Sequence, residues 1–101
     1  HNMMHNLKSK YTILIVDYVL TYIILVMKKL KKEGYNLLTT DSGPKALRIA
    51  DEKVPNLILL DIMMPGMDGY EVLQRLKSNP KTNGIPVIIM SALTMVRYKI
   101  I

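Results

Sequence analysis

The sequence of 101 residues contains no cysteine, no tryptophan and no phenylalanine, and its two histidines, His1 and His5, lie at the very start. The lack of cysteine excludes disulfide frameworks, thiolate metal sites and cysteine nucleophiles. Because no histidine follows position 5, the body of the chain has no Ser-His-Asp triad and no histidine metal cluster. Acyl-transfer hydrolysis is therefore disfavoured as a function.

Long hydrophobic runs are also missing. The longest run, residues 19–27, is well short of the roughly 20 apolar residues that a membrane-spanning helix needs. The first residues lack the small-residue cleavage site of a signal peptide. We therefore expect no membrane span and a cytoplasmic location, with residues 1–9 forming a start that is disordered or was introduced by cloning.

Negative charge is scarce, since 8 Asp and Glu stand against 14 Lys and Arg, which gives a net charge of +6. The densest basic cluster lies at the end of a predicted helix, where cations complement the helix dipole. No aromatic residue interleaves this cluster, as binding of single-stranded nucleic acid would require. We interpret it as a solvated helix end, and nucleic-acid binding by this domain is not expected. The cluster consists of Lys28, Lys29, Lys31 and Lys32.

Short apolar runs alternate with segments of helical periodicity. Strands are predicted over residues 11–16, 35–40, 57–60 and 86–90. Helices are predicted over about residues 20–33, from Pro44 to a break at Val54, and from the N-cap Asp68 to a break at Asn79. The wholly apolar character of most strands is typical of a parallel sheet that is covered on both faces. The pattern predicts one α/β domain over residues 10–101, a doubly wound parallel sheet with helices on both sides.

Polar side chains follow three of the predicted strands. They are Asp17, Asp61 and Ser91. In open α/β sheets, ligands bind at the carboxyl ends of the strands. Asp17 and Asp61 would repel each other there unless a cation lay between them, and Mg²⁺ suits an open site of oxygen ligands. An aspartate beside such a cation can act as a nucleophile toward phosphorus.

Three segments resemble the receiver domain of response regulators, the CheY-like family of two-component signal transduction. They are residues 13–17, 59–69 and 87–92, and the middle segment, LLDIMMPGMDG, is the most specific. The resemblance extends from about residue 10 to residue 94. It implies a flavodoxin-like fold with the strand order 2-1-3-4.

The resemblance also implies roles for individual residues. Asp61 would be the phosphoacceptor, and Mg²⁺ would be held by Asp17, Asp61 and the backbone carbonyl of Met63. Ser91 would be the switch hydroxyl. The partner implied is a histidine kinase or a phosphotransfer protein that donates the phosphoryl group.

Two features depart from the family pattern. Tyr18 stands where the family has a second acid, so we expect weakened Mg²⁺ binding and slower phosphorylation; its ring could also occlude the site. After residue 94 too little sequence remains for a helix, a fifth strand and a last helix, so these elements are expected to be missing or atypical. Lys99 is disfavoured as the family's phosphate-pairing lysine, because a parallel crossover takes about a dozen residues. An uncovered fourth strand would favour a homodimer or a strand-exchanged oligomer.

Two functions therefore remain open. The first is a receiver that is phosphorylated on Asp61 in a magnesium-dependent reaction, with no enzymatic activity beyond self-phosphorylation and autodephosphorylation at that residue. The second is a pseudo-receiver that keeps the fold and acts as a binding or assembly module without phosphorylation. A phosphohydrolase is disfavoured, because Met63 stands where such enzymes carry a second aspartate.

Overall fold

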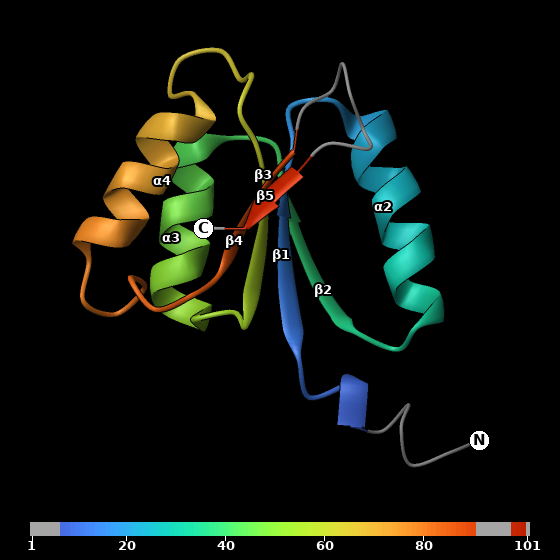
Figure 1. Cartoon of the computed structure of the whole chain (residues 1–101). Coiled ribbons are helices and arrows are strands. Elements are labelled where there is room, and N and C mark those ends of the chain that lie inside the picture. Colours follow the sequence, from blue (N-terminus) through green and yellow to red (C-terminus); the bar gives the residue numbers. More distant parts are fainter. Residues whose placement is uncertain (1–6, 91–97, 101) are drawn as a thin grey trace.

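The computed structural model describes residues 7–90 and 98–100 of the chain. Strands and helices alternate through this part until the last two strands (Figure 1). The elements are β1 (Thr12–Val16), α2 (Leu20–Lys32), β2 (Asn36–Thr40), α3 (Gly43–Lys53), β3 (Leu57–Asp61), α4 (Gly69–Ser78), β4 (Val87–Met90) and β5 (Tyr98–Ile100).

The strands form one sheet in the order β2-β1-β3-β4-β5. The first four are parallel, which confirms the predicted order 2-1-3-4. Val16 lies opposite both Thr40 in β2 and Leu60 in β3, and Asp61 lies opposite Met90 in β4. The carboxyl ends of these strands therefore meet at one edge of the sheet.

Helices cover both faces of the sheet, as the sequence predicts. In Figure 1, α3 and α4 lie on one side and α2 lies on the other. On the first side, Ala46 and Val72 are buried in a cluster with Leu14 and Leu60. On the second side, Ile23 of α2 packs with Ile15. Within the described residues, no helix is both long and apolar enough to cross a membrane.

The helix ends follow from local sequence signals. Ser42 caps α3 by accepting a hydrogen bond from the Lys45 N–H (3.3 Å), and Asp68 caps α4 by accepting one from the Glu71 N–H (2.9 Å). Both are residues that favour this position because their side chains satisfy free backbone N–H groups. The capping role predicted for Asp68 is confirmed. At its other end, α3 stops at Val54, which adopts a left-handed conformation with φ of 43°.

The fifth strand differs from the expectation. The prediction that β4 is uncovered is wrong, because β5 pairs with it and places Lys99 opposite Ile89. This strand runs antiparallel to β4, so the parallel crossover of about a dozen residues that argued against it is not required. The fifth strand is therefore present but atypical, and the unpaired edge that suggested strand exchange at β4 is covered over three residues.

Candidate functional site

Two acidic residues lie together at the carboxyl edge of the sheet. Asp61 is the last residue of β3, and Asp17 directly follows Val16, the last residue of the neighbouring strand β1. Asp61 is 2% exposed and Asp17 is 5% exposed. The structure thus brings together the two carboxylates that the sequence predicts to converge.

Backbone N–H groups hold the Asp61 carboxylate in place. The N–H of Met63 donates to Oδ1 at 3.0 Å, and the N–H of Tyr18 makes a longer contact with Oδ2 at 3.5 Å. Each oxygen therefore has a donor from a different loop, which fixes the plane of the carboxylate. Tyr18 contacts the site through its backbone, while its side chain is more than half exposed.

The pKa of the Asp17 carboxyl is raised from an ordinary 3.8 to about 6. Burial is the largest cause and the nearby charge of Asp61 adds to it, while the hydrogen bond from the N–H of Val19 to Oδ1 (2.9 Å) acts in the opposite direction. Within residues 7–90, no Lys or Arg side chain forms an ion pair with either carboxylate. A cation bound between the carboxylates of Asp17 and Asp61 would therefore stabilise this site.

The oxygen groups at this site are of the chemical type that binds a magnesium ion. Mg²⁺ prefers oxygen ligands and keeps several waters, so one or two carboxylates can suffice. The oxygens of Asp17 and Asp61 and the carbonyl of Met63, a residue in the adjacent exposed loop, are of this type. In the part of the chain that the structure describes, no three His, Cys, Asp or Glu side chains gather into a metal cluster. Position 18, directly after Asp17, carries a tyrosine and so adds no carboxylate to the pair of Asp17 and Asp61.

Ser91, the predicted switch hydroxyl, lies outside the described residues. Met90, the residue before it, is the last residue of β4 and lies opposite Asp61. The role of Ser91 therefore stays a prediction.

Two further residues at this edge were given no role from the sequence. The hydroxyl of Thr40 is buried without a hydrogen-bond partner, although the backbone carbonyl of Thr40 accepts from the N–H of Asp17 (3.2 Å). Gly69, the first residue of α4, lies directly against the backbone of Asp61. A glycine that directly follows a helix cap is the only sequence signal for such a contact, and nothing in the sequence marks the burial of Thr40.

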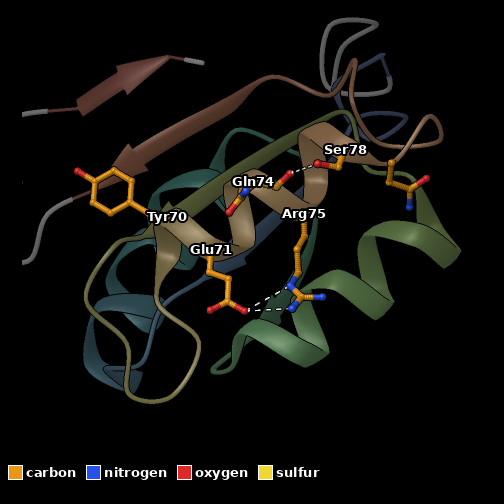
Figure 2. A pocket seen from close by; sticks show the side chains of 6 residues that line it. Tyr70, Glu71, Gln74, Arg75 and Ser78 are labelled. Atoms are coloured by element: carbon orange, nitrogen blue, oxygen red, sulfur yellow. Dashed lines mark hydrogen bonds and ion pairs between the residues drawn. The ribbon is translucent and has the colours of Figure 1, made fainter.

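Two cavities, each of about 670 Å³, lie away from the two carboxylates. The first follows the outer face of α4, where Glu71 and Arg75 form an ion pair (3.2 Å) beside Tyr70 and Gln74 (Figure 2). The second lies at the opposite, amino edge of the sheet and includes Lys8, whose Nζ pairs with Glu33 (2.7 Å). Neither cavity is lined by a predicted site residue.

The chain matches the family model of the response regulator receiver domain over residues 13–100. It is 46% identical over 81 residues to the response regulator PleD of Caulobacter vibrioides, which covers 80% of this chain and 18% of PleD. It is 37% identical over 92 residues to a histidine kinase of Formosa agariphila, covering 91% of this chain and 7% of the kinase. The chain therefore spans less than a fifth of these curated relatives.

Solved structures show the same similarity. The N-terminal domain of a response regulator receiver protein from Methanoculleus marisnigri matches with a TM-score of 0.79 and 41% identity, over 81% of this chain and 67% of that one. The chemotaxis protein CheY4 of Vibrio cholerae matches with a TM-score of 0.75 and 25% identity, over 79% of this chain and 67% of that one. These similarities agree with the flavodoxin-like order of the parallel strands.

Proposed function

The chain belongs to the response regulator receiver family of two-component signalling, and from this premise we propose that Asp61 is its phosphoacceptor. The observation that supports this role is the placement of the Asp61 carboxylate. It is buried at the carboxyl edge of the sheet, and its two oxygens face N–H donors from Met63 and Tyr18. A carboxylate held in a fixed plane presents its oxygens in a defined direction, which is what attack on a phosphorus atom requires.

The donor would be a phosphohistidine on a histidine kinase or a phosphotransfer protein. One Asp61 oxygen attacks the phosphorus, so that a P–O bond forms and the P–N bond to the imidazole breaks. The departing imidazole nitrogen takes up a proton. Asp61 is 2% exposed, so the surrounding loops must admit the donor before this step. No enzymatic activity is proposed beyond self-phosphorylation and autodephosphorylation at this residue.

Asp17, Asp61 and the backbone carbonyl of Met63 are the groups that would hold Mg²⁺. When bound, the ion would neutralise the charge that accumulates on the phosphoryl oxygens. The geometry supports this assignment, because Asp17 and Asp61 are buried at the same edge of the sheet and no Lys or Arg side chain within residues 7–90 forms an ion pair with either one. Tyr18 supplies no carboxylate, so we propose that the ion binds more weakly here than in a site with three acids.

The test is modification of the 101-residue chain by acetyl phosphate in the presence of Mg²⁺. We expect one added phosphoryl group, about 80 Da, on the peptide that contains Asp61. Asp61→Asn is the matched variant, because it keeps the shape of the side chain and removes the nucleophilic carboxylate. An unmodified wild-type chain, or equal modification of both proteins, would overturn the assignment.

A pseudo-receiver is the second candidate, and the side chain at position 18 favours it. Tyr18→Asp restores an acid beside Asp17, whereas Tyr70→Asp places the same charge on an equally exposed tyrosine of α4. If the chain is modified only after Tyr18→Asp, the native protein is a pseudo-receiver whose binding or assembly role does not depend on phosphorylation. If the wild type is already modified, that alternative is wrong.

Two expectations remain proposals. We propose that the protein acts in the cytoplasm, where the kinase domains that would serve it carry out phosphoryl transfer. A homodimer or strand-exchanged oligomer is also proposed, although β5 covers the β4 edge that first suggested it. A sizing column run on the purified chain tests the second proposal directly.

A further inference from the structure

The first turn of α4 lies directly on the backbone of Asp61. A Cβ atom added to Gly69 would overlap the Asp61 carbonyl oxygen and would lie 2.6 Å from the Ile62 Cα atom. Real Cβ atoms do not approach backbone atoms so closely. Position 69 therefore requires glycine for space, because any side chain would push the helix and the end of β3 apart.

The same residue closes the loop that follows Asp61. The N–H of Gly69 donates to the carbonyl of Ile62 at 3.2 Å, so the two ends of residues 62–69 are joined. Within that loop, Met63 donates the 3.0 Å hydrogen bond to the Asp61 carboxylate. A shift of Gly69 would move Ile62 and, with it, the donor that orients the carboxylate.

The first turn of α4 is also held from its other side. Val72 is fully buried, and a Cβ atom on Gly43 at the start of α3 would lie 2.9 Å from its Cγ2 atom. That added atom would also lie 3.0 Å from the side chain of Met67. The first turn of α4 is therefore packed between the start of α3 and the backbone of the phosphoacceptor.

We infer that Gly69 is a positioning residue for Asp61. The first turn of α4 sets the place of the Asp61 backbone, and the Met63 N–H then sets the direction of the carboxylate. The position of the helix therefore affects the Asp61 carboxylate indirectly, through the contact of Gly69 with the Asp61 backbone and through the N–H of Met63. This inference rests on the proposed function, because Gly69 can affect phosphoryl transfer in this way only if Asp61 is the phosphoacceptor.

The test compares Gly69→Ala with Gly84→Ala. Gly84 lies in the exposed loop before β4, and a Cβ atom there meets nothing within 4 Å, so the control makes the same chemical change in open space. The first readout is the position of the Met63 and Tyr18 amide resonances, because both N–H groups face the Asp61 carboxylate. The second readout is the rate of modification by acetyl phosphate with Mg²⁺.

We expect Gly69→Ala to move both amide resonances and to slow modification about tenfold to a hundredfold, since small displacements of reacting groups have effects of this size. Gly84→Ala should leave both readouts at their wild-type values. A folded Gly69→Ala protein whose Met63 and Tyr18 resonances are unchanged would overturn the inference. A loss of stability alone does not move these resonances in the molecules that remain folded.

If Gly69→Ala does not fold, Gly43→Ala can be used, because it should displace the first turn of α4 by a smaller amount. Its added atom meets the side chains of Val72 and Met67, which can yield, and not the backbone of Asp61. We expect a smaller shift of the Met63 resonance in the same direction, and an unmoved resonance would again overturn the inference. If the amide resonances move while the wild type accepts no phosphoryl group, the positioning role stands and the proposed function fails.

Discussion

Asp17 and Asp61 lie side by side at the ends of β1 and β3, and burial together with the charge of Asp61 raises the pKa of Asp17 to about 6. The two residues make different contacts with the same loop. Asp61 faces the N–H of Tyr18, and Asp17 accepts from the N–H of Val19. Backbone N–H groups of the segment that follows β1 therefore contact both carboxylates.

Asp17→Asn should stabilise the metal-free protein at neutral pH. The pKa of Asp17 is higher in the folded state than its ordinary 3.8, so the folded state binds this proton more tightly. The stability that this provides is present below about pH 4 and is lost as the pH rises through about 6. The free energy of unfolding of the wild type should therefore fall by about 2–3 kcal/mol relative to Asp17→Asn over that range.

Urea unfolding of both proteins at a series of pH values, without Mg²⁺, measures this difference. Adding Mg²⁺ should raise the stability of the wild type more than that of the variant, because the variant lacks one carboxylate. Curves that stay parallel from acid to neutral pH would show that Asp17 is not destabilised by its neighbour.

Tyr18→Asp should strengthen Mg²⁺ binding. An added carboxylate beside Asp17 raises the negative charge of the site, and the number of charged ligands tunes the affinity for hard cations over several powers of ten. We expect the midpoint of an amide NMR titration with Mg²⁺ to fall about tenfold or more. Tyr70→Asp, on the outer face of α4, should leave the midpoint near that of the wild type, and an equal gain in both variants would indicate a general charge effect.

Thr40→Val should stabilise the protein. The Thr40 hydroxyl is buried without a hydrogen-bond partner, and valine keeps the branched shape while removing that polar group. We expect a gain of about 1 kcal/mol in the free energy of unfolding. Thr82→Val is the matched control, because the buried Thr82 hydroxyl donates to the Leu76 carbonyl at 2.7 Å, and its loss should cost about 1–2 kcal/mol. Changes of the same sign in the two variants would contradict the interpretation.

Val54→Asn should also stabilise the protein. Val54 ends α3 with φ of 43°, a left-handed conformation that is unfavourable for a branched side chain, and it is 45% exposed, so it loses little packing. Asparagine tolerates this conformation far better, and we expect a gain of about 1 kcal/mol, measured by thermal or urea unfolding. Val54→Thr keeps the branching and should leave the stability nearly unchanged; a gain as large as that of Val54→Asn would point to another cause.

Much of the architecture could be predicted because its causes are local. Apolar runs marked three of the four parallel strands, and Asp68 marked the start of α4 by its capping chemistry. The convergence of Asp17 and Asp61 followed from one topological rule, that parallel strands end at the same edge of a sheet. None of these predictions needed knowledge of the packing.

The remaining features depend on residues that are distant in the sequence. The antiparallel direction of β5 was not predicted, because a strand of three residues carries no local signal for the direction in which it pairs. The orphaned hydroxyl of Thr40 and the tight contact of Gly69 with Asp61 depend on what the folded chain places beside them. A composition or spacing argument contains no information about such neighbours.

β5 pairs antiparallel with β4, a strand that is near it in the sequence, and this gives it a different place in the folding of the molecule. The parallel pairs connect distant parts of the chain, such as Ile13 with Leu57, whereas β5 pairs with a strand only a few residues before it and places Ile100 opposite Ile88. Pairing two strands that are close in sequence costs little conformational entropy, but a ladder of three residues adds little cooperativity. β5 can therefore detach and return while the four parallel strands stay assembled. Amide protons of β5 should exchange with solvent by local opening, and those of β1 and β3 only when the whole molecule unfolds.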